Sequence, residues 1–256
     1  MSLEKNVEFL RHLPKLSAFK GLPGYGRTHS PALRSPLVEI NDFGSNPGGL
    51  RMFAFVPEHL PRAPALVVVL HGCGQNAAGY DLGAGWSTLA ERYGFALLMP
   101  EQTASNNANT CFNLFNPEDI ARGSGEAGSI RQMIARIAGD HDIDSRRIYV
   151  TGQSMGGAGA WNMIAHRPQF FAAAVICCGS ISTEDGTGSI DTPLWNFHGD
   201  SDKTVPVSVS RDRVARRRKA GGRPLYTEYA GVDHNVWEWA FTEPELVKWF
   251  FSQRRG

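Results

Sequence analysis

The pentapeptide GQSMG at residues 152–156 places Ser154 between two glycines at the end of a predicted strand. An apolar run at residues 147–151 precedes it, and the small residues 157–160 begin a predicted helix. In a strand–turn–helix of this kind the serine hydroxyl projects above the sheet, and the glycines make room for the tight backbone. A glycine turn without a catalytic role would have the same pattern, but the small residues that follow favour a helix packed close to neighbouring strands. We therefore predict that Ser154 is a nucleophile.

A serine hydroxyl becomes an effective nucleophile when a base takes its proton and an acid orients that base. On turns of this type the chain order is serine, then acid, then histidine. Two loops that follow predicted strands downstream contain these residue types, at residues 198–206 and 231–235. We predict that His234 is the base and that Asp202 orients it.

The same chain contains alternatives for both roles. Asp200 competes with Asp202, which we favour because it lies further into its turn, and Asp200 would then stabilise that turn. His198 and His71 compete with His234. Each of these two lies in a His-Gly pair directly at a strand end, where an imidazole more often braces loops, so His234 is the preferred base.

Attack by a serine on a carbonyl also requires N–H donors for the developing oxyanion. One donor is expected to be the backbone N–H of Met155, the residue after the nucleophile. The second is expected from the loop LHGCGQ at residues 70–75, where we favour the N–H of Cys73 over that of Gly74. A glycine turn with no catalytic duty is the alternative interpretation of this loop.

Three side chains near these loops are candidate substrate contacts. Trp195 precedes the acid loop, Trp237 follows the base, and Gln153 precedes the nucleophile. Most aromatic residues in such a domain belong to its core. These two tryptophans are nevertheless the ones we expect as walls of an acyl or alcohol pocket.

The elements that must position these residues alternate between strands and helices. The turn NPGG at residues 46–49 predicts an antiparallel hairpin, and the continuous apolar run at 65–70 predicts a strand covered on both faces. This order predicts a mostly parallel, doubly wound α/β sheet with helices on both faces, the α/β-hydrolase arrangement. The predicted strands are 37–40, 50–56, 65–70, 95–99, 147–151, 173–178, 193–197 and 225–229, and the predicted helices are 86–93, 125–141, 155–166, 207–220 and 244–253.

The pattern indicates one catalytic domain at residues 36–256, preceded by an N-terminal extension at 1–35 that contains a short helix and a loop. A long connection at residues 100–123 exceeds ordinary loop length and is a candidate wall or lid of the active site.

Composition restricts the class of protein. The 256 residues are 42% hydrophobic and 20% charged, with a formal net charge of +1, which fits one soluble α/β domain. The near-neutral charge argues against a nucleic-acid partner, and the basic run at 216–219 is interpreted as a solvated helix end. No stretch reaches the roughly 18 apolar residues of a membrane span. The oligomeric state is not encoded in any recognisable pattern.

The N-terminus is interrupted by charged residues and lacks the apolar core of a secretory signal. The compartment is therefore left open: secreted or periplasmic if a signal was removed, and cytoplasmic otherwise.

The chain has four cysteines, none at zinc-site spacing. Cys177 and Cys178 are adjacent in an apolar strand and are predicted to be buried thiols. Cys73 and Cys111 belong to loops that should flank the active site. We hypothesise a disulfide between them, with two free thiols as the alternative.

Several segments resemble the poly(3-hydroxybutyrate) depolymerase-like esterases, which belong with feruloyl and acetyl xylan esterases to the carbohydrate esterase family one group. These segments are FGSNPG (43–48), LHGCGQ (70–75), AGYD (78–81), GWS (85–87), MPEQ (99–102), CFN (111–113) and GEA (125–127). The resemblance covers about residues 37–256 and implies neither a metal nor an organic cofactor.

In the second half, GQSMGG (152–157) and residues 195–206 look more like small esterases often labelled predicted peptidases or lipoprotein esterases. Depolymerase-like members more often carry SAGG where this chain has SMGG, a departure that leaves the triad intact and puts polymer specificity in doubt.

We expect a serine carboxylic-ester hydrolase that acts on small or soluble esters of feruloyl, acetyl or hydroxyalkanoate type. A polyhydroxybutyrate depolymerase is an alternative, weakened because no appended substrate-binding domain or Thr-rich linker is visible. A serine peptidase of the oligopeptidase kind is a further alternative, but it usually needs a gating domain. A non-catalytic binding protein is disfavoured because every triad position is filled.

Overall fold

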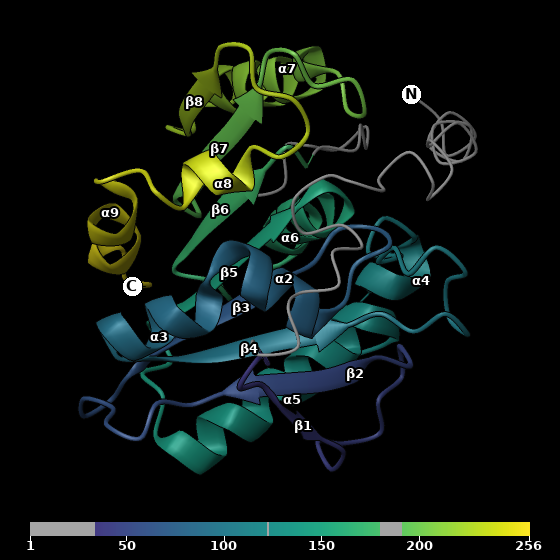
Figure 1. The fold of residues 1–256 in the computed structure, drawn as a ribbon, viewed down its shortest axis with the longest axis vertical. Coiled ribbons are helices and arrows are strands. Elements are labelled where there is room, and N and C mark those ends of the chain that lie inside the picture. Colours follow the sequence, from purple (N-terminus) through teal and green to yellow (C-terminus); the bar gives the residue numbers. More distant parts are fainter. Residues whose placement is uncertain (1–33, 122, 180–190) are drawn as a thin grey trace.

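The computed structural model describes residues 34–121, 123–179 and 191–256, so the predicted extension at 1–35 falls almost entirely outside the described residues. In these ranges an eight-stranded sheet has the order β1-β2-β4-β3-β5-β6-β7-β8 (Figure 1). Its strands are β1 (Val38–Ile40), β2 (Arg51–Phe55), β3 (Ala65–Leu70), β4 (Phe95–Glu101), β5 (Ile148–Gln153), β6 (Ala173–Cys177), β7 (Leu194–Gly199) and β8 (Leu225–Tyr229).

Strand direction brings the functional loops to one edge of the sheet. β2 pairs antiparallel with β1 and β4, and the other neighbouring strands pair in parallel. The register aligns Leu70 with Gly152, and Gln153 with Cys177, so β3, β5 and β6 end together. The loops after these strands and after β7 and β8 therefore converge at the carboxyl edge. The predicted hairpin and the mostly parallel sheet are confirmed.

Helices cover both faces of the sheet. They are α2 (Ala77–Ala84), α3 (Trp86–Tyr93), α4 (Pro117–Ile120), α5 (Gly125–His141), α6 (Ser154–His166), α7 (Val207–Lys219), α8 (Trp237–Ala240) and α9 (Leu246–Ser252). Among the described residues, no helix combines the length and apolar character needed to span a membrane.

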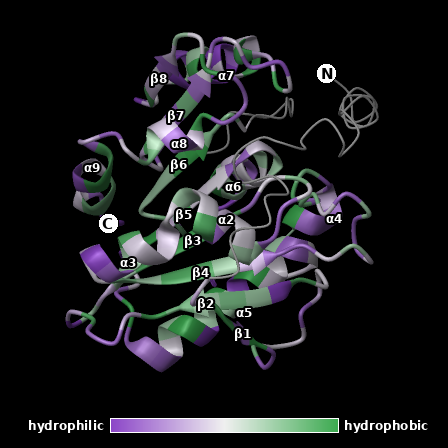
Figure 2. Ribbon diagram, viewed as in Figure 1, coloured by the Kyte–Doolittle hydropathy of each residue, from purple (hydrophilic) through white to green (hydrophobic). Residues whose placement is uncertain are grey.

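Two apolar cores lie on opposite faces of the sheet. On β3, Leu66 and Val68 pack with residues of α5 and α6, whereas Val67 and Val69 pack with residues of α2, α3, α8 and α9. This alternation follows from the two-residue repeat of a strand. Figure 2 shows hydrophobic colouring concentrated on the central strands and hydrophilic segments in the outer loops. The strands at the centre are therefore held from both sides, which makes them a rigid base for the loops above.

The structure adds elements that the sequence pattern did not predict. Helix α2 begins at Ala77 and is capped by Asn76, whose side chain accepts a hydrogen bond from the Gly79 N–H at 2.7 Å. Its two glycines, Gly79 and Gly83, weaken the helical signal. The connection at residues 100–123 is also not entirely loop, since β4 extends to Glu101 and α4 forms within it.

Gly156 in the first turn of α6 offers a test of helix-to-strand packing. A Cβ at Gly156 would lie 2.3 Å from the Leu70 carbonyl oxygen, so we expect Gly156→Ala to lower the free energy of unfolding by roughly 2 kcal/mol or more. Gly139 in α5 is the control, because a Cβ there meets nothing within 4 Å. Gly139→Ala should stabilise by about 0.5–1 kcal/mol. Urea unfolding of both variants measures the difference, and equal effects would contradict the packing argument.

Candidate active site

Ser154 lies on a strained turn between β5 and α6. Its φ of 52° is in the left-handed region, which a side chain other than glycine rarely adopts. The turn also requires its glycines, because a Cβ at Gly152 would meet the Gly156 carbonyl carbon at 2.5 Å, and Gly156 itself abuts the end of β3. Strain of this kind is typical of a nucleophile held above a sheet edge.

The structure brings Ser154, His234 and Asp202 together from three separate loops. His234 Nε2 lies 2.9 Å from Ser154 Oγ, and His234 Nδ1 lies 2.7 Å from Asp202 Oδ2. The imidazole and the Asp202 carboxylate are fully buried, and Ser154 as a residue is 6% exposed. A ring whose Nδ1–H donates to a carboxylate leaves Nε2 free to accept the serine proton. The arrangement can therefore activate the Ser154 hydroxyl.

Asp202 is held in its ionised form by its surroundings. Burial alone would raise the pKa of this carboxyl, but hydrogen bonds from His198 and His234 outweigh burial and hold its pKa well below the usual range. Its Oδ1 also accepts from the backbone N–H groups of Thr204 and Val205, each at 2.8 Å. The neighbouring His198 Nε2 lies 3.2 Å from Oδ2. A carboxylate with this many donors is fixed in orientation.

Asp200, the alternative acid, lies at the surface instead. Its Oδ1 accepts from the Gly231 N–H at 2.7 Å and from the Ser201 hydroxyl at 2.9 Å. These contacts tie the acid loop to the loop before His234. Asp200 therefore has the geometry of a turn-stabilising residue.

Two groups lie behind the base: Cys178, whose contact the sequence did not anticipate, and Trp237, which was expected as a pocket wall. Cys178, which follows β6, donates its thiol hydrogen to the His234 carbonyl at 3.5 Å. Trp237 is fully buried and its ring lies edge-on to the His234 ring, with 6.4 Å between centroids. Trp237 thus packs behind the base rather than forming an open pocket wall. No local sequence signal marks Cys178, because its neighbours come from a loop 56 residues away.

Within the described residues, Cys178, Asp202 and His234 are also the one group whose metal-ligating atoms lie within 4.8 Å of one another. Both ring nitrogens of His234 are already engaged, one with Asp202 and one with Ser154. A metal ion at this cluster would therefore have to displace one of these His234 contacts.

The predicted oxyanion loop lies beside the start of α6. The Gly74 N–H donates to the Asn109 carbonyl at 2.9 Å and to Thr110 Oγ1 at 3.1 Å, so this alternative donor is already engaged. Cys73 and Met155 belong to one small apolar cluster, together with Cys111 and Ala158. The two residues whose N–H groups are the predicted donors therefore share this cluster.

A disulfide joins Cys73 to Cys111, with a Cα–Cα distance of 4.3 Å. It ties the predicted oxyanion loop to the long connection after β4, across a sequence separation of 38 residues. The other two cysteines, Cys177 and Cys178, are free and buried. The hypothesised pairing is therefore the one present in the structure.

The remaining substrate candidates are placed differently from the expectation. Trp195 lies near the start of β7, away from the carboxyl edge, and its ring packs against Phe197 and Trp249. Its position in the core, with Nε1 donating to Thr227, does not bring it to Ser154. Gln153 is fully buried, and its Nε2 donates to the Gln75 side chain. Gln153 thus links the end of β5 to the loop at residues 70–75.

The sheet order and the serine turn define an α/β-hydrolase fold. The chain belongs to the esterase PHB depolymerase family, whose model matches residues 53–223. Over 227 residues it is 46% identical to poly(3-hydroxyalkanoate) depolymerase C of Paucimonas lemoignei, covering 77% of this chain and 52% of that protein.

Other relatives carry related names. The chain is 33% identical over 224 residues to acetylxylan esterase A of Aspergillus oryzae, covering 85% of this chain and 71% of that protein. It is 32% identical over 159 residues to feruloyl esterase B of Neurospora crassa, covering 62% of this chain and 53% of that protein. The chain spans about half the length of the Paucimonas lemoignei and Neurospora crassa relatives.

Solved structures show the same fold. A thermostable esterase superposes with a TM-score of 0.72 at 29% identity, covering 86% of this chain and 63% of that one. The acetyl xylan esterase from Aspergillus awamori gives a TM-score of 0.72 at 21% identity, covering 84% of this chain and 98% of that one.

The disulfide generates a stability prediction. Replacing both partners (Cys73→Ser with Cys111→Ser) should lower the free energy of unfolding by about 2–4 kcal/mol, because the unfolded chain loses a cross-link. Urea unfolding with and without dithiothreitol is the measurement. Reductant should shift the wild-type midpoint toward that of the variant and leave the variant unchanged. A wild-type midpoint that stays constant while its free thiols rise from two to four would contradict this.

Proposed function

We propose that this protein is a serine carboxylic-ester hydrolase that forms an acyl-enzyme on Ser154. The observation that carries the proposal is the hydrogen-bonded series from Ser154 through His234 to Asp202, built on a strained turn at the carboxyl edge of the sheet. Membership of a family whose relatives are named as esterases and depolymerases supports the same chemistry.

In the acylation half-reaction, Ser154 Oγ attacks the ester carbonyl carbon while His234 Nε2 accepts its proton. The ionised Asp202 stabilises the imidazolium through the Nδ1–H bond. The carbonyl oxygen becomes an oxyanion and accepts hydrogen bonds from the N–H groups of Met155 and Cys73. The tetrahedral intermediate then collapses, and the alcohol leaves with the proton from His234.

Deacylation repeats these steps with water as the nucleophile. His234 accepts a proton from water, the resulting hydroxide attacks the acyl carbon, and the acid is released as Ser154 Oγ regains its proton. Both half-reactions use the same base and the same oxyanion donors. The protein's own side chains supply every proton transfer in this scheme.

For the substrate class we propose small or soluble esters of feruloyl, acetyl or hydroxyalkanoate type. The named activities of the Neurospora and Aspergillus relatives favour the first two. A polyester depolymerase is the second candidate, favoured by the 46% identity to a poly(3-hydroxyalkanoate) depolymerase. Comparing rates on suspended polyhydroxybutyrate granules and on a soluble hydroxybutyrate dimer ester separates the two.

Replacing the nucleophile tests the proposal directly. Ser154→Ala should lower the rate of p-nitrophenyl butyrate hydrolysis by about three to six orders of magnitude, because it removes the acyl acceptor. Ser208→Ala, on the exposed side of α7, is the matched control and should retain wild-type rates. Fluorophosphonate labelling should mark the wild type and the control but not Ser154→Ala. Undiminished turnover by Ser154→Ala would exclude this triad.

The two aspartates of the acid loop give a second matched pair. Asp202→Asn should lower kcat by about 10³- to 10⁴-fold, since it removes the group that orients the His234 tautomer. Asp200→Asn should remain within about threefold of wild type. Steady-state rates on p-nitrophenyl butyrate report both, and a larger loss in Asp200→Asn would reverse the assignment.

The wild-type rate should also fall at acid pH. Because the pKa of Asp202 is held well below its usual range, that carboxylate stays ionised at pH 5 and does not account for the loss. The loss is expected because a general base must be unprotonated to accept the serine proton. A pH profile of kcat/KM is the measurement. An acid limb that persists unchanged in the residual activity of His234→Ala would reject His234 as the base.

A further inference from the structure

Glu126 is a fully buried carboxyl group that the mechanism above does not use. It lies in the first turn of α5, and its Oε1 accepts from Gln102 Nε2 at 2.5 Å and from Asn106 Nδ2 at 3.3 Å. Its Oε2 accepts from the Asn113 backbone N–H at 2.7 Å. All three donors come from one segment, residues 102–113. Both ends of that segment are therefore hydrogen-bonded to the same carboxyl group.

Glu126 can accept hydrogen bonds from these donors whether its carboxyl group is ionised or protonated. Burial raises the pKa of Glu126 to about 8, the nearby Asp119 carboxyl adds to that rise, and the donors from Gln102 and Asn113 counter it. Both oxygens of a carboxyl group keep lone pairs whether or not one oxygen carries a proton. An amide in its place has one oxygen only, so Glu126→Gln must leave a donor facing an NH₂ group.

One connection runs from Glu126 to the oxyanion loop through Gln102 and His71. The Gln102 backbone N–H donates to His71 Nε2 at 3.1 Å. Because Nε2 accepts, Nδ1 must carry the proton, and it donates to the Gly72 carbonyl at 2.8 Å. Burial lowers the pKa of His71 to about 4, which keeps the ring neutral in this role. The ring thus holds the backbone immediately before Cys73.

A second connection runs through the disulfide. Gln102 Nε2 also donates to the Cys111 carbonyl at 3.0 Å, and Asn113 is the residue held by Glu126 Oε2. These two bonds fix the backbone on Cys111 and two residues beyond it. Cys111 is covalently bonded to Cys73.

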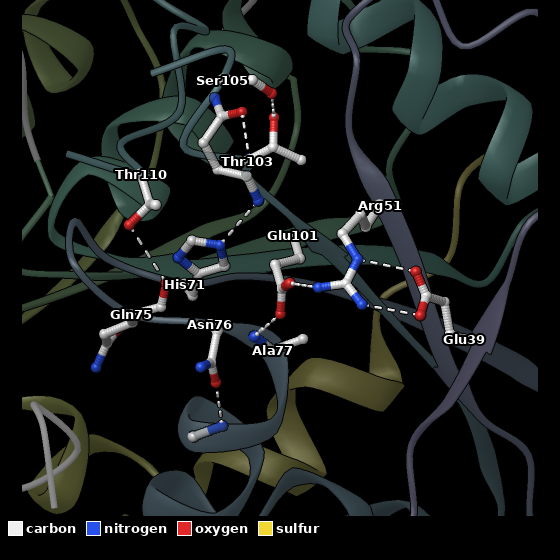
Figure 3. Close-up of polar contacts among 12 residues, drawn as sticks. Glu39, Arg51, His71, Gln75, Asn76, Ala77, Glu101, Thr103, Ser105 and Thr110 are labelled. Carbon is white, nitrogen blue, oxygen red and sulfur yellow. Dashed lines mark hydrogen bonds and ion pairs between the residues drawn. The ribbon is translucent and has the colours of Figure 1, made fainter. Parts of the chain in front are cut away.

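The same segment touches the oxyanion loop a third time, at its far end. Thr110 Oγ1 accepts from the Gly74 N–H at 3.1 Å. The same hydroxyl donates to the Gln75 carbonyl at 3.5 Å (Figure 3). Cys73 is therefore held on both sides and through its own sulfur. Each of these contacts depends on where residues 102–113 lie.

We propose that Glu126 is a positioning residue that sets the Cys73 N–H in the oxyanion hole, acting through residues 102–113. The inference rests on the proposed function, in which Cys73 donates to the oxyanion. Glu126 touches no reacting atom itself. Its effect is transmitted by hydrogen bonds to Gln102 and Asn113, and then by the His71 ring and the disulfide.

The variants Glu126→Ala and Glu126→Gln test the proposal by kinetics. Glu126→Ala should lower kcat for p-nitrophenyl butyrate by about ten- to a hundredfold, the scale of a misplaced catalytic donor, with KM within about threefold. The kcat of Glu126→Gln should lie between those of Glu126→Ala and the wild type, because glutamine keeps one acceptor oxygen. The inhibition constant of a trifluoromethyl ketone, whose adduct with Ser154 carries an oxyanion, should rise by the factor by which kcat/KM falls.

The trifluoromethyl ketone separates positioning from a general loss of folded protein. Loss of folded molecules lowers the apparent kcat but leaves the inhibition constant of the remaining enzyme unchanged. The matched control is Asp144→Asn, a carboxylate that joins loops at the opposite edge of the sheet through Arg146 and Arg254. It should leave the inhibition constant at the wild-type value. Unchanged inhibition constants in both Glu126 variants would overturn the proposal.

Hydrogen exchange keeps this test independent of ester hydrolysis. In Glu126→Ala, the amides of residues 71–75 and 102–113 should exchange faster than in wild type, and in Asp144→Asn they should not. If Glu126→Ala does not fold, Glu126→Gln and Gln102→Leu provide the same comparison. Wild-type protein without esterase activity would overturn the proposed function while exchange still tests the positioning. If the amides of residues 71–75 exchange at the wild-type rate in these variants, the proposed positioning role of Glu126 is overturned.

Discussion

The close approach of α6 to the end of β3 is the constraint on which the site depends. Gly156 stands against the carbonyl groups of Leu70 and His71, at a separation that excludes any side chain. This contact sets the N-terminus of α6 directly beside the loop that carries Cys73. The strained φ of Ser154 is tolerated because the same contact and the buried strands around it fix the turn.

Buried carboxylates organise the loops above this contact. Asp202 is hydrogen-bonded to the acid loop and to His234, and Glu126 is hydrogen-bonded to residues 102–113. Glu101 accepts from the Ala77 N–H and from Arg51, which also pairs with Glu39 (Figure 3). Loops at a sheet edge lack ladder hydrogen bonds, and one carboxylate can accept from several backbone or side-chain donors at once. The two apolar cores stabilise the domain, whereas the buried carboxylates fix the conformation of the loops at the carboxyl edge of the sheet.

The sequence predicted the parts of the molecule that local pattern encodes. Continuous apolar runs located the strands, because strands covered on both faces carry no polar alternation. Trp195 was expected near the substrate from its place before the acid loop, but distance along a strand does not reveal which face or which end a side chain occupies. The partners of Cys178 and Glu126 could not be read from local pattern, since those of Cys178 lie 56 residues away and those of Glu126 belong to a separate segment at residues 102–113. The helix α2 was missed because its glycines hide its period.

The state of the cysteines has a practical consequence for spectroscopic work. Two of the four sulfurs are joined in the disulfide, and the other two belong to side chains with no exposed surface. A folded molecule therefore presents no thiol to a bulky maleimide dye. A single cysteine introduced at an exposed position such as Ser105, on the connection after β4, would take up one fluorophore without prior removal of the native cysteines. Its emission would then follow the movement of that connection in an otherwise unaltered protein.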